Sequence, residues 1–321
     1  MLGSVRLKKI LLFADPGVDD AFAIMYALLH PELEVVGIVC DYGNVSHSAA
    51  CRNTSFLLKL ADRKDIPIIN GSSTPLSGVA PQLFPEIHGY KGIGGLDLTD
   101  VQSLYLHPFF KIYELIEQYE LDLTIVNLSR LTSLAKLFMQ MGSEMQQKVK
   151  DIIIMGGAFL VPGNWTPLAE ANVYGDPQAA RIVASMGKNM TFVPLNISNR
   201  AIISNGMIDR LSNHTQTPFT PILEPIMDFY SKKYNEIIPG IQGAPIHDVT
   251  LLSYLTDKSP FHVIQKQVFV VTEGPAKGMT FADFRPVPEM VSNYPVNQII
   301  LNFNVEQFQN DFMKVFSGFE P

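Results

Sequence analysis

The chain has 321 residues, 47% of them hydrophobic and 17% charged, which is typical of a globular protein without a disordered tail. The formal net charge is -7 and no cluster of lysine and arginine stands out, which argues against nucleic acid or an anionic membrane as the main partner. No stretch approaches the about 20 apolar residues of a membrane helix, and the first apolar run is shorter than the roughly 7 to 15 residues of a secretion signal. With two cysteines, Cys40 and Cys51, we expect a cytoplasmic protein in a reducing compartment.

Short apolar runs alternate with helical patterns along the first part of the chain. The apolar runs predict strands at 8–14, 33–40, 121–128, 150–157 and 189–196. Apolar residues spaced three and four apart predict helices at 18–31, 46–61, 131–141 and 176–187. Strands that alternate with helices form a mostly parallel sheet, and solidly apolar strands are typical of a sheet covered on both faces.

After about residue 199 the pattern changes. The sequence predicts helices at 221–238, 247–255 and 305–316, and strands at 266–274 and 297–305. We interpret these segments as the completion of one domain that spans residues 1–321. The alternative is that they form a separate small domain.

The unusual polar residues gather directly after the predicted strands. Asp15, Asp19 and Asp20 follow the first strand, and Asn44 follows the second. Ser129 to Thr132 and Met155 to Gly157 follow later strands. In open parallel sheets, ligands bind outside the carboxyl ends of the strands. We therefore expect these segments to meet at one edge of the sheet.

Asp15, Asp19 and Asp20 fall where a strand ends and a helix begins, and two explanations are open. Asp15 could cap the helix, with Asp19 and Asp20 favoured by the helix dipole. Alternatively, a hard cation such as Ca²⁺ or Mg²⁺ removes the repulsion between carboxylates. In that case Asp15 and Asp20 are the ligands and Asp19 points elsewhere.

Two further polar sites lie far along the chain. His247 and Asp248 begin an apolar helix, where an aspartate is also a common cap. The long loop at 163–177 carries Asn164, Glu170 and Asn172. Such loops are usually solvated, but carboxylates and amides at a cleft edge suit the recognition of sugar hydroxyls, which donate and accept hydrogen bonds.

Taken together, these motifs resemble the nucleoside hydrolase family, the inosine-uridine preferring type of nucleoside N-ribohydrolase. "DPGVDD" at 15–20 is similar to the N-terminal Asp-Pro-Gly-x-Asp-Asp signature of that family. Similar blocks follow in the family's order at 42–44, 88–95, 129–135, 155–180 and 246–248. The resemblance implies a Rossmann-like α/β domain with an open, mostly parallel sheet, helices on both faces and additional C-terminal helices and strands.

The resemblance also implies a set of site residues. Ca²⁺ would be held by the carboxylates of Asp15, Asp20 and Asp248 and the backbone carbonyl of Thr132. Asp15 would also be the general base for the attacking water. The ribose hydroxyls would be held by Asp19, Asn44, Asn164, Glu170, Asn172 and Asp248. Met155 would line the sugar pocket, and His247 and His88 would lie near the nucleobase.

The residue types agree with hydrolysis of an N-glycosidic bond. Its transition state is an oxocarbenium-like sugar, whose positive charge a carboxylate-rich pocket stabilises. A histidine with an unshifted pKa near 6.5 could protonate the leaving base, and we assign that role to His247. The same carboxylates would repel a phosphate, so we expect free nucleosides as substrates. The family resemblance further implies a homodimer or homotetramer.

Several positions depart from the family pattern. Phe13 replaces the usual aspartate before the first ligand, Ser129 and Arg130 replace Gly-Pro, and Ala171 replaces an aromatic residue. These changes leave open a non-catalytic homologue that binds Ca²⁺ and ribosides. A Mg²⁺-dependent phosphotransferase is a further alternative, although no motif supplies its phosphate site.

Three aromatic residues near these motifs have two interpretations each. Trp165 beside Asn164 could stack on the base, but packing is the commoner role of a single loop aromatic. Tyr230 and Tyr234 share one helix face, which suits either core packing or contact with the base.

Overall fold

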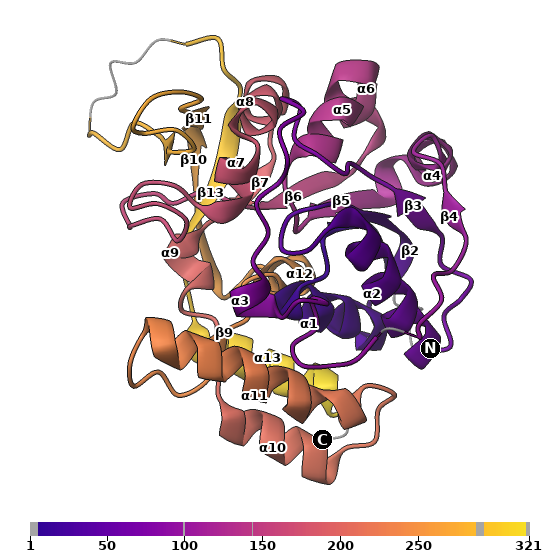
Figure 1. Cartoon of the computed structure of the whole chain (residues 1–321). Helices are drawn as coiled ribbons and strands as arrows, with labels where there is room; N and C mark the ends of the chain where they lie inside the picture. Colours follow the sequence, from indigo (N-terminus) through magenta and orange to yellow (C-terminus); the bar gives the residue numbers. More distant parts are fainter. Residues whose placement is uncertain (1–5, 99, 143, 287–291, 319–321) are drawn as a thin grey trace, which may run out of the picture.

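The computed structural model describes residues 6–98, 100–142, 144–286 and 292–318. Within them, a nine-stranded sheet has the order β10-β13-β7-β6-β5-β1-β2-β3-β4 (Figure 1). Neighbouring strands are parallel except for β10, which runs antiparallel to β13. Two small antiparallel sheets pair β11 with β12 and β8 with β9. The strands are β1 (Lys8–Ala14), β2 (Leu33–Cys40), β3 (Ile68–Asn70), β4 (Leu106–His107), β5 (Leu123–Asn127), β6 (Asp151–Met155), β7 (Thr191–Val193), β8 (Ile202–Ile203), β9 (Ala244–Pro245), β10 (Phe261–Gln267), β11 (Phe269–Val270), β12 (Thr280–Phe281) and β13 (Val296–Phe303).

Helices connect most of the strands, and a single 3₁₀ turn covers Glu120–Asp122 before β5. The helices are α1 (Val18–Leu29), α2 (His47–Leu60), α3 (Pro85–His88), α4 (Lys111–Tyr119), α5 (Thr132–Met141), α6 (Glu144–Lys148), α7 (Ala171–Gly175), α8 (Pro177–Met186), α9 (Leu195–Ser198), α10 (Asn205–His214), α11 (Thr220–Ile237), α12 (Val249–Thr256) and α13 (Val305–Phe316).

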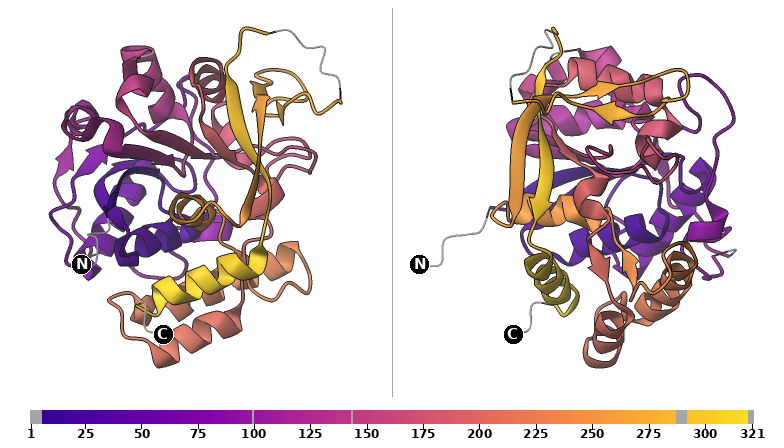
Figure 2. Two further views of the ribbon diagram at one scale, coloured as in Figure 1. Left: turned by 180° about the vertical axis from the view of Figure 1, so that it is seen from behind. Right: turned by 90° about the vertical axis from the view of Figure 1, so that its left-hand side faces the viewer.

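Alternate residues of β1 enter two separate apolar cores, one on each face of the sheet. Ile10 and Leu12 belong to the core that α1, α2, α12 and α13 complete. Leu11 and Phe13 belong to the core that α4, α5 and α8 complete. Both cores are fully buried at these positions, so β1 has no face that tolerates a polar side chain. The predicted α/β sheet with helices on both faces is therefore confirmed (Figure 2).

The order of the strands explains where a site can form. From the central strand β1, the chain adds β2, β3 and β4 on one side and then β5, β6 and β7 on the other. The connections that follow β1 and β5 therefore run in opposite directions along the sheet. At such a switch point, the loops after the two strands leave a crevice at the carboxyl edge of the sheet.

Two predicted strands are wrong in their limits. The strand predicted at 189–196 is shorter, because β7 ends at Val193 and α9 begins at Leu195. The segment predicted at 266–274 divides, because β10 ends at Gln267 and Phe269–Val270 turns away to pair with β12. β10 itself is an edge strand whose side chains are only half buried or exposed. Its sequence, FHVIQKQ, mixes polar and apolar residues, so it lacks the apolar run of a central strand.

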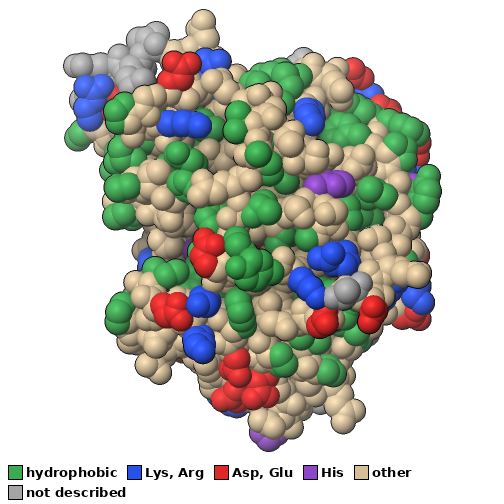
Figure 3. All heavy atoms as spheres, viewed as in Figure 1, with side chains coloured by type: hydrophobic (Ala, Val, Ile, Leu, Met, Phe, Trp, Pro, Cys, Tyr) green, Lys and Arg blue, Asp and Glu red, His purple; other side chains and the backbone are tan. Residues whose placement is uncertain are grey.

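None of the helices in the described residues is both long enough and apolar enough to cross a membrane. On the face shown in Figure 3, acidic and basic side chains are interspersed over the surface.

Candidate active site

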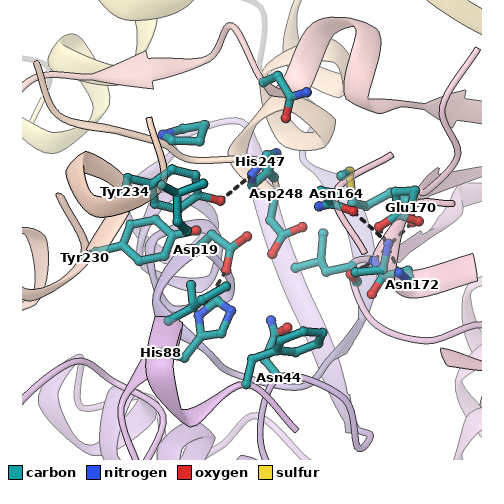
Figure 4. A pocket seen from close by; sticks show the side chains of 18 of the residues that line it. Asp19, Asn44, His88, Asn164, Glu170, Asn172, Tyr230, Tyr234, His247 and Asp248 are labelled. Atoms are coloured by element: carbon teal, nitrogen blue, oxygen red, sulfur yellow. Dashed lines mark hydrogen bonds and ion pairs between the residues drawn. The ribbon is translucent and has the colours of Figure 1, made fainter. Parts of the chain in front are cut away.

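A cavity of about 400 Å³ opens at the carboxyl edge of the sheet, beside the switch point between β1 and β5. In Figure 4, Tyr230 and Tyr234 lie on one side and Glu170 and Asn172 on the other, with Asp248 between them. The predicted site residues that line this cavity are Asp19, Asn44, His88, Met155, Asn164, Glu170, Asn172, His247 and Asp248. Residues from distant parts of the chain thus converge, as the positions of the polar residues after the strands predicted.

Asp20 is fully buried and binds the backbone of the turn that starts α1. Its Oδ1 accepts a hydrogen bond from the backbone N–H of Asp15 at 3.1 Å, and its Oδ2 accepts one from Gly17 at 3.2 Å. The side-chain amide of Asn44 donates to the same Oδ2 at 2.9 Å. The residue at the N-cap position is Gly17, so the capping role suggested for Asp15 is wrong.

The carboxylate of Asp15 is also fully buried, but only one of its oxygens is satisfied. Oδ2 accepts a hydrogen bond from the backbone N–H of Asn44. Oδ1 has no hydrogen-bond partner in the described part of the chain. Burial, followed by the negative charge of Asp20, raises the pKa of Asp15 well above its ordinary value.

Asp248 occupies the N-cap position of α12, yet its side chain makes no capping hydrogen bond. Its carboxylate instead joins those of Asp19 and Asp20, with one oxygen atom from each lying within 4.8 Å of the others. We expected Asp19 to point elsewhere, so its position in this group differs from that expectation. Asp15 lies outside this group of three.

The positive charge of Arg130 does not offset the burial and mutual repulsion of these carboxylates. Burial, followed by the charge of Asp20, raises the pKa of Asp19 to about 8. Burial, followed by the charges of Asp19 and Asp20, raises the pKa of Asp248 well above its ordinary value. Oδ1 of Asp19, like Oδ1 of Asp15, is buried and has no partner within the described residues. Three converging buried carboxylates, with a partnerless oxygen on Asp19 and another on the neighbouring Asp15, fit a hard divalent cation.

Sequence reasoning missed the buried carboxylate of Asp41, which directly follows β2. It accepts hydrogen bonds from the Ser129 hydroxyl at 3.0 Å, from the backbone N–H of Ser72 at 2.7 Å and from the Ser133 hydroxyl. Asp41 thereby anchors the loop at 129–133 that carries Thr132. The signal was available, because Asp41 is a polar residue at the end of an apolar strand.

Thr132 is fully buried at the start of α5, and its side chain is engaged away from the carboxylates. Its hydroxyl donates to Asp176 at 2.8 Å and lies 2.9 Å from the hydroxyl of Tyr42. The side chain thus serves the local structure, and the predicted contact of the Thr132 backbone carbonyl with a cation stays a prediction.

The predicted sugar-binding residues of the 163–177 loop already bind protein groups. Glu170 caps α7, with Oε1 accepting from the backbone of Asn172 at 2.8 Å and Oε2 from Val173 at 3.1 Å and Gly157 at 3.2 Å. Asn164 accepts a hydrogen bond from the backbone of Ala171 at 2.9 Å. These bonds hold the loop against the cavity, so part of the polar character of the loop is structural.

His88 is a buried, neutral histidine. Its Nδ1 accepts a hydrogen bond from the backbone N–H of Val18 at 3.1 Å, so this nitrogen carries no proton. Burial, followed by the charge of Arg130, lowers the pKa of His88 to about 3. The approach of Asp19 Oδ1 to 3.8 Å from the same nitrogen is therefore not an ion pair.

His247 lies in a chain of hydrogen bonds. Its Nε2 is 3.0 Å from the hydroxyl of Tyr234, and its Nδ1 is 3.0 Å from the hydroxyl of Ser198. Burial lowers the pKa of His247 to about 4, so the unshifted pKa near 6.5 assumed from the sequence is wrong. Tyr230 packs against Tyr234 with 4.9 Å between ring centroids, and both tyrosines line the cavity.

Trp165 packs against protein rings. It stacks on Tyr174 at a centroid distance of 5.1 Å and meets Phe84 edge-on at 4.3 Å. The packing interpretation therefore accounts for Trp165.

Comparisons with known proteins agree with this geometry. A model described as "Inosine-uridine preferring nucleoside hydrolase" matches residues 10–310. The chain is 34% identical over 278 residues to Uridine nucleosidase 1 of Arabidopsis thaliana, covering 86% of this chain and 82% of that protein. It is 31% identical over 309 residues to the pyrimidine-specific ribonucleoside hydrolase RihA of Klebsiella pneumoniae, covering 93% and 95%. The solved structure of a plant nucleoside hydrolase, PpNRh1, superposes with a TM-score of 0.88 at 30% identity, covering 97% of this chain and 99% of that chain.

Proposed function

This chain belongs to the inosine-uridine preferring nucleoside hydrolase family, and we propose that it releases the base from pyrimidine ribonucleosides. It is a nucleoside N-ribohydrolase, a hydrolase that acts on N-glycosyl bonds. The printed activities of the relatives, uridine and pyrimidine nucleoside hydrolysis, support the pyrimidine preference. The observation that carries the mechanism is the convergence of Asp19, Asp20 and Asp248, of which Asp19 and Asp248 line the cavity.

The charges of the site stabilise the transition state more than they stabilise the bound substrate. The nucleoside enters neutral, whereas its sugar gains positive charge as the bond to the base breaks. Buried carboxylates therefore stabilise the transition state more than the ground state, which is the condition for catalysis. Because these carboxylates are buried, this interaction is stronger than it would be at the surface.

The chain offers ligands for a calcium ion beneath the cavity. Asp15, Asp20 and Asp248 would contribute carboxylates, and Thr132 its backbone carbonyl. A bound Ca²⁺ would lower the pKa of a water molecule and fix its orientation. Asp19, which lies in the same close group as Asp20 and Asp248, would be a further carboxylate near the ion.

Asp15 is the proposed general base. Its Oδ1 has no partner, while the Asn44 backbone N–H holds the other oxygen and fixes the carboxylate plane. An oriented carboxylate with one vacant oxygen can accept the proton of an attacking water within hydrogen-bond reach.

The sugar hydroxyls would be held by carboxylates and amides around the cavity. Asp19 and Asp248 accept from hydroxyl groups, and Asn44 and Asn164 each keep part of an amide group for the ligand. Glu170 contributes its charge and any remaining acceptor capacity, and Met155 packs against the sugar. Asn172 is also in reach, although its amide is largely engaged.

Tyr234 and His247 would act on the leaving base. Because the pKa of His247 is about 4, this residue is neutral near pH 7 and works through its hydrogen bonds. The Tyr234 hydroxyl would donate a proton to the base. His247 would support this step through its hydrogen bond to the same hydroxyl. His88, with its Nδ1 occupied, would contribute a neutral Nε2–H donor.

The test is a substrate panel with and without a chelator. Uridine, cytidine, inosine, adenosine and uridine 5′-monophosphate are incubated with the protein, and released base is measured by chromatography. We expect uracil and cytosine to appear fastest, the monophosphate to be inert, and a chelator to stop release until Ca²⁺ is restored. Faster release from inosine would overturn the pyrimidine preference, and equal turnover of the monophosphate would overturn the preference for free nucleosides.

Asp15→Ala provides the matched test of the base. We expect turnover to be lost while the melting temperature stays close to that of the wild type. Near-normal turnover by this variant would exclude Asp15 from that role.

A further inference from the structure

Arg130 places a guanidinium group inside this acidic site. The residue follows β5, is 1% exposed and lines the cavity. Its Nη1 donates to the side-chain oxygen of Asn172, and its guanidinium lies 5.6 Å from the centroid of the Phe84 ring. Its Nη2 is buried and, within the described residues, has no hydrogen-bond partner. An unsatisfied buried donor is costly, so a bound ligand that accepts from Nη2 would gain affinity.

Two glycines leave the space that the arginine occupies. A Cβ added at Gly175 would lie under 3.0 Å from Cδ and Nε of Arg130. Gly175 ends α7 and does not have a positive φ angle, so its backbone does not require glycine. A Cβ added at Gly43 would lie 3.1 Å from Cζ of Arg130 and closer still to Oδ2 of Asp15, so this glycine leaves room for both side chains. The surroundings are therefore fitted to an arginine at position 130.

The side-chain amide of Asn172 holds this arrangement through both its nitrogen and its oxygen. Its Nδ2 donates to the carbonyl oxygens of Leu128 at 2.6 Å and Met155 at 3.2 Å, and these bonds use both amide hydrogens. Its oxygen accepts from Arg130. Because carbonyls only accept and arginine only donates, the orientation of the amide is fixed. Asn172 therefore has no N–H left for a sugar hydroxyl.

We propose that Arg130 is a specificity-determining residue of the sugar subsite, whose Nη2 donates a hydrogen bond to a ribose hydroxyl oxygen in place of Asn172. This inference rests on the proposed function, because it takes the ligand to be a ribonucleoside. A hydroxyl group suits the position, since its oxygen accepts from Arg130 while its hydrogen is donated to a neighbouring carboxylate.

The surrounding charge favours a neutral ligand group over an anion. The buried carboxylates of the site are those of Asp15, Asp19, Asp20, Glu170 and Asp248. One guanidinium and one divalent cation carry fewer positive charges than these five groups carry negative ones when ionised. A phosphate or carboxylate on the sugar would therefore be repelled, whereas a hydroxyl group would not.

The test compares uridine with 2′-, 3′- and 5′-deoxyuridine in the wild type and in Arg130→Met. A charged hydrogen bond to a hydroxyl contributes about a 10- to 100-fold factor. We expect kcat/KM for uridine to fall by about that factor in the variant, and to fall much less for at least one deoxy analogue that lacks the hydroxyl in question. Analogues too slow to assay as substrates are measured as competitive inhibitors of uridine hydrolysis. Equal losses for all four compounds would overturn the proposal, because a purely structural role affects every substrate alike.

Gly175→Ala tests the same idea without removing any polar group. The added Cβ should displace the guanidinium, so this variant should lose the same discrimination between uridine and that analogue. In an Arg130→Met background, Gly175→Ala should have little further effect, because the crowded side chain is absent. An equal effect of Gly175→Ala with and without Arg130 would contradict the proposal, and this comparison remains decisive if Arg130→Met alone folds poorly.

Failure of the proposed function and failure of the role of Arg130 give different results. If the wild type releases no base from any nucleoside, the proposed function is wrong. If the wild type releases base from uridine but its discrimination among the deoxy analogues is unchanged by both substitutions, only the role of Arg130 is wrong.

Discussion

The hydroxyl of Tyr234 lies 3.0 Å from Nε2 of His247, and the other ring nitrogen of His247 is 3.0 Å from the hydroxyl of Ser198. Both nitrogens of the imidazole are therefore engaged. Burial holds the pKa of His247 at about 4, which keeps the ring neutral around pH 7. The group that we propose to act on the leaving base is therefore a neutral tyrosine and histidine pair and not a charged histidine.

Tyr234→Phe should slow release of uracil from uridine by roughly 100-fold, the lower range for loss of a general acid. It should have little effect on 4-nitrophenyl β-D-ribofuranoside, whose leaving group departs without a proton. The control is Tyr254→Phe, since that hydroxyl bonds to Gln298, and neither residue lines the cavity. Equal losses on both substrates would show that Tyr234 does not act on the leaving group.

The pH dependence of the His247 contribution follows from its pKa. With a pKa of about 4, the charged fraction of His247 stays small between pH 5.5 and 8. The ratio of kcat/KM for wild type to that for His247→Ala should therefore be constant across this range. Effects of the carboxylates cancel in the ratio because both proteins retain them. A ratio that changes by about tenfold around pH 6.5 would instead indicate an ordinary histidine pKa.

Calcium should stabilise the fold as well as support turnover. At a free concentration about 100 times the dissociation constant, a ligand that binds only the native state adds about 2.7 kcal/mol, or roughly 5 °C in Tm for a chain of this size. Asp248→Asn should abolish that shift, because it removes one of the three converging carboxylates. Asp65→Asn is the matched control, since Asp65 is exposed and pairs with Arg63. An unchanged shift in Asp248→Asn would place the ion elsewhere.

Asp41→Asn should lower the free energy of unfolding by about 1–3 kcal/mol, because an NH₂ group would face donors that now point at a carboxylate. Urea unfolding measures this loss. We also expect lower kcat/KM, since Asp41 holds the loop of Ser129 and Ser133 that carries Arg130. A variant with full stability and activity would show that the anchor is dispensable.

The pH dependence of the Asp41 effect has a defined sign. Burial raises the pKa of Asp41 to about 6, so between that value and its unfolded pKa near 4 the native state binds more protons than the unfolded state. The stability of the wild type relative to Asp41→Asn should therefore increase as the pH falls from about 6 to 4. A decrease in this relative stability as the pH falls from about 6 to 4 would contradict the raised pKa.

Much of the fold could be predicted because its strands are buried on both faces. The apolar runs at β1 and β2 leave no polar face, and this pattern indicates a covered parallel sheet. Edge strand β10 was misplaced because its half-buried, mixed sequence resembles a loop. The pattern identifies a strand only where burial on both faces forces it to be apolar.

That Asp15, Asp19 and Asp20 lie at the carboxyl edge of the sheet was predictable, since polar residues after parallel strands share that edge. Asp248 follows β9 of a small antiparallel sheet, so its place beside Asp19 and Asp20 was expected only from the family resemblance. Which atoms remain free at that edge was not predictable. The engagement of both Asn172 amide hydrogens, the depressed pKa of His247 and the contact between Arg130 and Gly175 all depend on neighbours from distant segments. Residue types and their spacing along a chain specify which groups gather, whereas hydrogen-bond saturation and desolvation depend on three-dimensional packing, which a linear pattern does not contain.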